Sequence, residues 1–90
     1  MSDVTDNGRG RFEMPVEGET AFVSYRREDG VLALLHAEVP THLEGRGIGA
    51  KLVKGVLDQA RANGEKVVPY CSFVAAYIRR HPEYRDLVAT

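Results

Sequence analysis

The 90-residue chain has 43% hydrophobic residues, 28% charged residues and a formal net charge of −1. This composition is typical of one soluble globular domain with a modest core. The near-neutral charge excludes a general attraction to nucleic acid or to an anionic membrane, and no segment is apolar for long enough to cross a bilayer. The single cysteine excludes an internal disulfide and a cysteine-rich metal site, so we expect a cytoplasmic protein without a metal.

The first half of the chain predicts a tail followed by three strands. Residues 1–10 are polar and glycine-containing, so we expect a disordered tail before a domain of residues 11–90. Apolar and polar residues alternate in residues 11–16 and 21–25, which predicts two strands joined by a turn at residues 16–19. Asp29-Gly30 is a hairpin signal, and the nearly continuous apolar run that follows predicts a central strand covered on both faces. These segments predict an antiparallel meander.

The second half predicts a β-α-β crossover and a C-terminal helix. Pro40 ends the third strand, and the spacing of Thr41 and Glu44 predicts a short turn with a capping box. From Ile48 the apolar residues recur at helical spacing until Gly64 ends the helix. The segment KVVPYC predicts a fourth strand, parallel to the third, and SFVAAYIRR predicts a second helix that ends before Pro82, with a final turn after it. The fold class is therefore α+β.

The stretch LEGRGIGAKLV, residues 43–53, carries three glycines where a strand leads into a helix. Its spacing fits neither a Walker phosphate loop nor a dinucleotide fingerprint. A helix start nevertheless offers unpaired N–H groups to an anion such as a phosphate, and Arg46 and Lys51 add positive charge at the rim. The alternative is that the glycines only permit a tight turn and close packing of the helix on the sheet. The residues alone leave both interpretations open.

The stretch resembles the acyl-CoA pyrophosphate loop of the Gcn5-related N-acetyltransferases, written Q/R-x-x-G-x-G/A. Gly47-Ile48-Gly49 matches G-x-G, whereas Glu44 stands where the family has Gln or Arg. The segments HAEVP…GRGIGAKLV and VVPYCSFVAAYIRRHPEY are together similar to a branch of small, single-domain members with a PxCSFV…HPEY-type C-terminal signature. The resemblance covers about residues 11–88.

The resemblance implies the acyl-CoA N-acyltransferase fold, in which the third and fourth strands splay apart. The pantetheine arm of acetyl-CoA would lie in that gap, along the backbone from Ala37 to Val39. The diphosphate would sit on the loop and first helical turn, and the start of the second helix would lie beside the cofactor. The residues implied to bind the cofactor are Ala37, Val39, Arg46, Gly47, Ile48, Gly49, Ala50, Lys51, Cys71 and Ser72.

Acetyl transfer needs a held thioester, a deprotonated amine and a stabilised leaving thiolate. Cys71 begins the second predicted helix, where a thiol ionises more readily and can act as a nucleophile, although a lone cysteine can equally be a small buried apolar residue. His36 and Glu38 alternate along the third strand and share one face. Either can take the proton from an acceptor amine, and either can be an ordinary solvated strand residue.

Two further candidates lie on the second helix. Many members of the superfamily use a tyrosine there to protonate the leaving thiolate, a role that Tyr77 would take. The apolar stripe around Tyr77 favours a packing role instead. The basic residues Arg79, Arg80 and His81 can bind the 3′-phosphate of CoA or an acidic acceptor. Basic residues at the C-terminal end of a helix also stabilise the helix dipole, without any ligand.

The predicted function is acetyl transfer from acetyl-CoA to an amine, on a protein lysine, a polyamine or a small metabolite. The alternative is a non-catalytic acyl-CoA-binding module or subunit, because the helices that build the acceptor site in larger relatives are missing and Glu44 breaks the loop pattern. A nucleic-acid-binding role is disfavoured by the neutral charge, and no membrane partner is expected. We expect a monomer or a weak homodimer.

Overall fold

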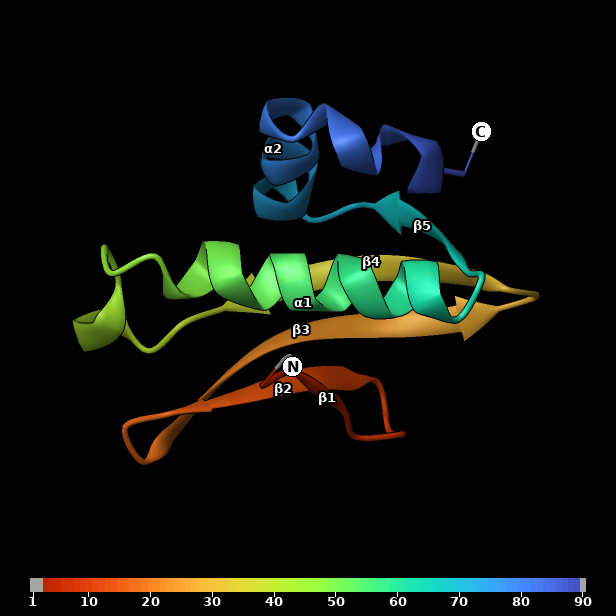
Figure 1. Ribbon diagram of the computed structural model, residues 1–90. Coiled ribbons are helices and arrows are strands. Elements are labelled where there is room, and N and C mark those ends of the chain that lie inside the picture. Colours follow the sequence, from red (N-terminus) through yellow and green to blue (C-terminus); the bar gives the residue numbers. More distant parts are fainter. Residues whose placement is uncertain (1–2, 90) are drawn as a thin grey trace.

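The computed structural model describes residues 3–89 and shows one mixed sheet with helices packed against it (Figure 1). The strands follow one another across the sheet in chain order: β1 (Thr5–Asp6), β2 (Arg11–Val16), β3 (Glu19–Glu28), β4 (Val31–Glu38) and β5 (Lys66–Pro69). The helices are α1 (Ile48–Ala62) and α2 (Ser72–Arg80), with 3-10 turns η1 (Thr41–Leu43) and η2 (Pro82–Leu87). Among the described residues, none of the helices has the length and apolar character needed to span a bilayer.

The predicted topology is confirmed. β2, β3 and β4 form an antiparallel meander, and β5 pairs with β4 in parallel after the α1 crossover. The two hairpin turns lie where the sequence placed them, at residues 17–18 and 29–30. The second helix and the final turn also match their predicted positions, whereas the fourth strand ends at Pro69, two residues earlier than expected.

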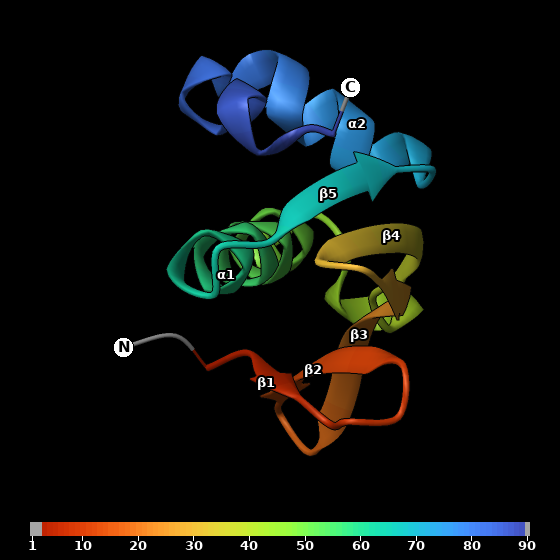
Figure 2. The ribbon, with the colours of Figure 1, turned by 90° about the vertical axis from the view of Figure 1, so that its right-hand side faces the viewer.

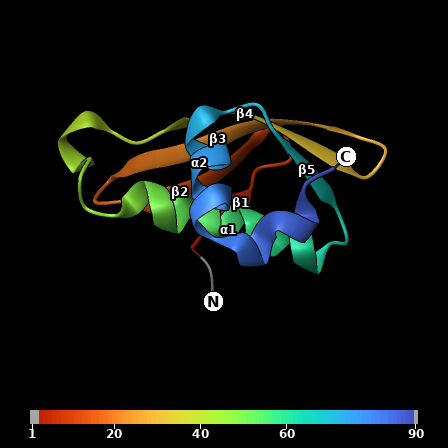
Figure 3. The same ribbon diagram turned by 90° about the horizontal axis from the view of Figure 1, so that it is seen from above.

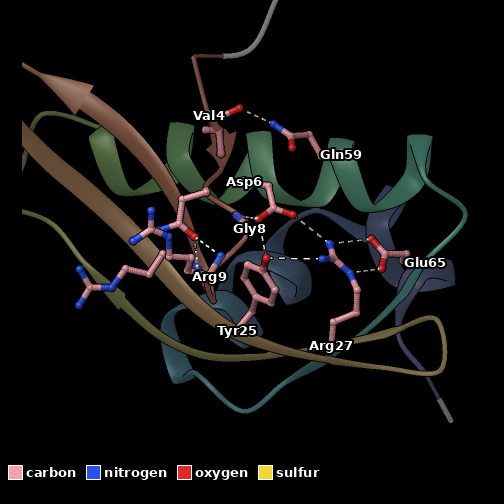
Figure 4. Close-up of polar contacts among 10 residues, drawn as sticks. Val4, Asp6, Gly8, Arg9, Tyr25, Arg27, Gln59 and Glu65 are labelled. Carbon is pink, nitrogen blue, oxygen red and sulfur yellow. Dashed lines mark hydrogen bonds and ion pairs between the residues drawn. The ribbon is translucent and has the colours of Figure 1, made fainter.

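The prediction of a disordered tail over residues 1–10 is wrong for the part that the structure describes. β1 pairs with β2, and the side chain of Val4 is buried in the core. The Asp6 carboxylate accepts hydrogen bonds from the Tyr25 hydroxyl (2.5 Å) and from Arg27 Nη2 (3.1 Å), and Arg27 also bonds to Glu65 (Figure 4). Long-range polar contacts, rather than apolar periodicity, hold this segment. Residues 1–2 of the predicted tail lie outside the described residues.

The core lies between the sheet and α1. One face of β2, β3, β4 and β5 contributes alternate buried side chains, and α1 covers this face (Figure 2). α2 and η2 lie beyond β5 and reach α1, as the view from above also shows (Figure 3). Apart from Leu43, the buried apolar side chains of the described residues form one cluster: Val4, Phe12, Met14, Ala21, Val23, Tyr25, Leu32, Leu34, Leu52, Val53, Val56, Leu57, Ala60, Val67, Val74, Tyr77, Ile78, Tyr84 and Leu87.

Two local predictions are wrong. β4 is central but covered on one face, because Leu32 and Leu34 are buried whereas Leu35 is 40% exposed. An apolar run therefore does not by itself indicate cover on both faces. The capping box is also absent: η1 begins after Pro40, and no side chain caps it.

Candidate functional site

The site begins where β4 and β5 separate. Their parallel pairing runs only from Val31–Lys66 to Leu34–Pro69. The Cys71 N–H donates to the Leu34 carbonyl (3.0 Å), and the chain then enters α2 while β4 continues to Glu38. Within residues 3–89 the end of β4 therefore has no strand partner on this side, and the predicted splay is confirmed.

A β-bulge turns the side chains at the end of β4. Ser24 pairs with His36 and Tyr25 pairs with Leu34, so Leu35 is the extra residue. After the bulge, Ala37 lies opposite the buried Val23 and therefore faces the side covered by α1. His36 lies on the opposite, uncovered face of the sheet.

A pocket of about 450 Å³ occupies the splay, and we call it the splay pocket. It lies between the end of β4, the glycine-rich loop and the first turns of α1 and α2. Its walls are mainly aliphatic and backbone, with one carboxylate and one aromatic ring. The lining residues are Ala37, Val39, Leu43, Glu44, Gly45, Gly47, Ile48, Gly49, Ala50 and Phe73.

The loop gives the pocket a row of free backbone donors. Gly45 and Gly47 have φ of 83° and 76°, a region that favours glycine, and Gly47 is the N-cap of α1. The first bond within the helix is donated by the Lys51 N–H to the Gly47 carbonyl (3.1 Å). The N–H groups of residues 48–50 therefore have no partner within the helix, and all three residues line the pocket. Such a helix start suits an anion.

Gly49 serves a different purpose from the other two glycines. Its backbone has an ordinary helical conformation, so no positive φ requires glycine there. A Cβ at this position would lie 2.8 Å from Phe73 Cζ and 3.1 Å from Cε2. The missing side chain therefore makes room for the ring of Phe73, which joins the first turns of α1 and α2. Phe73 belongs to the predicted apolar stripe around Tyr77, and that pattern alone does not indicate its place in the pocket.

The comparisons with known proteins agree with this architecture. The GCN5-related N-acetyl-transferase family matches residues 11–87. The chain belongs to the GCN5-related N-acetyltransferase family. It is also similar to a solution structure of a GCN5-like protein from Staphylococcus aureus, assigned as an N-acetyltransferase, with a TM-score of 0.72 and 29% sequence identity. That match covers 99% of this chain and 91% of the other, so the acetyltransferase-like fold extends over the whole described domain.

Some of the residues predicted to bind the cofactor line the splay pocket, and the others do not. Ala37, Val39 and the four consecutive residues 47–50 line the splay pocket. Arg46, Lys51, Cys71 and Ser72 do not line it. Lys51 instead lines a second cavity of about 340 Å³, next to Lys54 on the flank of α1.

Acidic residues at and directly after the turn between β2 and β3 pair with two basic residues near the pocket, one in the loop and one in η1. Arg46 Nη2 donates to Glu17 Oε2 (2.5 Å), and His42 forms an ion pair with Glu19 when protonated. Glu44 lines the pocket, and among residues 3–89 no cation pairs with its carboxylate. Arg46 therefore does not neutralise Glu44 in this conformation.

None of the four predicted catalytic side chains lines the splay pocket. His36 and Glu38 do share a face, as predicted: His36 Nε2 lies 3.4 Å from Glu38 Oε1, and both side chains are 61% exposed. Cys71 is the N-cap residue of α2 and is half-buried against the core.

Tyr77 lies in the contact between α2 and η2. Its ring is buried and stacks on His81 with centroids 3.9 Å apart, and His81 Nδ1 bonds to the Tyr77 carbonyl (2.9 Å). Burial raises the pKa of the Tyr77 hydroxyl. This position agrees with the packing interpretation. Arg79 and Arg80 are exposed in the last turn of α2.

Proposed function

We propose that the chain binds acetyl-CoA in the splay pocket and transfers its acetyl group to an amine. The observation that carries this proposal is the position of the pocket between the free amides at the start of α1 and the unpaired end of β4. Membership of the GCN5-related family supports the reaction class. We also propose that the chain belongs to the family branch with the PxCSFV…HPEY signature. We propose in addition that the protein is cytoplasmic.

The pocket residues fit two parts of acetyl-CoA, the diphosphate and the pantetheine arm. The N–H groups of residues 48–50 would hold the diphosphate, because they begin α1 without partners inside the helix and because Gly49 and Ala50 have little or no side chain to cover them. The backbone of Ala37 to Val39 would hold the pantetheine arm through the strand edge that β5 leaves unpaired. Glu44 does not fit an anion, and Arg46 is bound to Glu17. We therefore assign diphosphate recognition to backbone amides rather than to side-chain cations.

The candidate groups for proton transfer lie on the other face of β4. Acetyl-CoA, when bound, supplies the reactive thioester. The His36 imidazole or the Glu38 carboxylate would accept the proton of an amine that approaches from the uncovered face of the sheet. The Cys71 N–H makes the last backbone hydrogen bond to β4, so its thiol lies at the point where the splay begins and is the candidate nucleophile. Tyr77 is assigned to packing.

The alternative function is a non-catalytic acyl-CoA-binding module. One specific observation favours it: none of the side chains at 36, 38, 71 and 77 lines the splay pocket. A binding module needs only the amides and the strand edge, whereas an enzyme must also bring one of these groups to the thioester.

The binding step is tested by thermal unfolding of the protein with CoA and with acetyl-CoA. A ligand that binds only the folded state raises the melting temperature by mass action. We expect stabilisation by both ligands. An unchanged melting temperature at millimolar ligand would remove both the enzyme and the binding module.

The chemical step is tested by release of free CoA thiol in a screen of lysine peptides, polyamines and small amines. We expect release with at least one acceptor class, and a large loss of rate in His36→Gln or in Glu38→Gln. Binding without release across the screen would favour the module. An acetyl adduct in the intact mass that disappears in Cys71→Ala, with loss of turnover, would assign the nucleophile role to Cys71.

A further inference from the structure

The acyl end of the proposed donor points toward the start of the splay. With the diphosphate at residues 48–50, the pantetheine arm runs from Val39 back along β4. In the same direction the strand next reaches Leu35, beside the hydrogen bond from the Cys71 N–H to the Leu34 carbonyl (3.0 Å). An acceptor amine therefore meets the thioester at this end of the pocket.

Two exposed apolar residues, Leu35 and Tyr70, flank the start of the splay. They directly follow Leu34–Pro69, the last residue pair of the two parallel strands. Leu35 is the extra residue of the β-bulge, and the Tyr70 N–H turns back to the Val68 carbonyl (3.1 Å). Leu35 is 40% exposed, Tyr70 is 69% exposed, and neither lines the splay pocket. They form an apolar lip on the open side of the splay.

Polar residues on the uncovered face of the sheet lie in rows across β2, β3 and β4. The register gives one row of Arg11, Ser24 and His36 and a second row of Glu13, Phe22 and Glu38. Arg11 Cζ lies 3.8 Å from the centroid of the Phe22 ring, and Arg26 follows farther along β3, opposite Ala33. Among residues 3–89, neither Arg11 nor Arg26 forms an ion pair with a carboxylate.

These unpaired arginines bear on which amines can bind. An alkyl arm on the apolar lip would bring its amine to His36 and Glu38, and the Glu38 carboxylate attracts a protonated amine. Neighbouring strands are about 4.8 Å apart, so the backbones of Arg11 and His36 are separated by about 10 Å. An anionic group at the far end of the arm would be within reach of a guanidinium, whereas a second cation there would be repelled.

We propose that the apolar lip and the uncovered face beside it are the acceptor site, and that this site selects a primary amine whose aliphatic arm ends in or adjoins an acidic group. This inference rests on the proposed function and names its acceptor class. A free ω-amino acid and a lysine followed by an acidic residue in a peptide share this chemistry.

The test measures thiol release from acetyl-CoA with 6-aminohexanoate, hexylamine and 1,6-diaminohexane, which present a primary amine on arms of similar length. We expect kcat/KM to be highest for 6-aminohexanoate and lowest for the diamine, with about tenfold between them. The double variant Arg11→Gln, Arg26→Gln should reduce this ratio to within about twofold. Arg79→Gln, which changes an exposed arginine on α2, is the matched control and should keep the wild-type ratio.

The apolar lip is tested separately. Tyr70→Ala should raise the KM of all three amines by about fourfold or more, because it removes the apolar contact with the arm. Tyr70→Phe keeps the ring and should restore the wild-type KM. Equal KM values in Tyr70→Ala and wild type would remove Tyr70 from the acceptor site.

Two lysine peptides, in which aspartate or a second lysine follows the reactive lysine, distinguish the sources of the acceptor. Faster turnover of the aspartate peptide than of 6-aminohexanoate would assign a peptide, and the reverse would assign a free amino acid. Equal rates within both sets of acceptors, or a preference for the diamine, would overturn the inference and leave acetyl transfer intact. Thiol release with none of these acceptors, although acetyl-CoA binds, would overturn the inference and favour the binding module. No binding of acetyl-CoA would overturn the proposed function as well.

Discussion

Arg46 of the glycine-rich loop is bound to Glu17 in the turn between β2 and β3, with Nη2 2.5 Å from Oε2. The two residues are far apart in the sequence, and both side chains are more than half exposed. The acidic turn therefore competes with any anion for the one arginine of the loop. Exposed ion pairs of this kind contribute up to about 1 kcal/mol.

Glu17→Gln should release Arg46 and strengthen the binding of CoA by roughly two- to fivefold, the range that such a pair permits. The measurement is the dissociation constant at low ionic strength, where surface charges are least screened. Glu19→Gln is the matched control, since Glu19 begins β3 directly after the same turn and pairs with His42. Weaker binding in Glu17→Gln would mean that the pair preorganises the loop instead.

Ala50→Glu should weaken CoA binding by at least about tenfold, because it places a carboxylate beside the free amides in the first turn of α1. The fold should not suffer, since an acidic side chain in the first turn stabilises a helix. Ala62→Glu, at the exposed last residue of the same helix, adds the same charge far from the pocket. Equal affinities of the two variants would contradict the anion site.

A double-mutant cycle tests the contact between Gly49 and Phe73 without any ligand. In the Phe73→Ala background, Gly49→Ala should raise the free energy of unfolding by about 0.5–1 kcal/mol through helix propensity. In the wild-type background the gain should be smaller, because the new methyl group must displace the ring. A coupling free energy between the two substitutions below about 0.3 kcal/mol, which is within simple additivity, would show that the position of the Phe73 ring does not depend on glycine at residue 49.

Tyr25→Phe should lower the free energy of unfolding by about 1–2 kcal/mol at neutral pH, because it removes the hydrogen bond to Asp6. Partial burial acts to raise the pKa of Asp6, but the bonds from Tyr25, Gly8 and Arg27 outweigh it and lower that pKa below its ordinary value of 3.8. The contribution of Asp6 is thus fully present above pH 3.8 and is lost as the pH falls through its lowered pKa.

The pKa of Tyr25 moves in the opposite direction, raised by burial and by the bond to Asp6. Its contribution is present below its ordinary pKa of 10 and is lost as the pH rises through the raised value. The difference between wild type and Tyr25→Phe should therefore be constant from about pH 5 to 9 and shrink at both ends. A difference that grows toward acid would contradict this account. The exposed Tyr70→Phe variant should show no such difference.

The sequence predicted those parts of the fold that depend on local patterns. Alternation and helical spacing located β2, β3, α1 and α2, and the family resemblance implied the gap between β4 and β5 that the pocket occupies. β1 was missed because two residues carry no periodic pattern and because its partners, Tyr25 and Arg27, are distant in the chain.

The positions of two residues at the site also depend on long-range contacts. Arg46 was expected at the diphosphate, but its partner Glu17 lies in another hairpin. Phe73 belongs to the same helical stripe as the buried Val74, and only the approach of Gly49 distinguishes it. One available signal was Gly49 itself, since a glycine within an otherwise regular helix indicates a close neighbour.

The central claim, that backbone amides at the start of α1 hold the diphosphate of an acyl-CoA donor, is tested most directly by following amide resonances of the protein by NMR as CoA is added. We predict that the largest shifts occur at the N–H groups of Ile48, Gly49 and Ala50, with smaller changes at Ala37 on β4 and at Val39 just after it. The same titration with pantetheine, which lacks the phosphates, should move the β4 amides and leave the helix start unchanged. Large shifts confined to Lys51 and Lys54 beside the second cavity, with the amides of residues 48–50 unmoved, would contradict the claim.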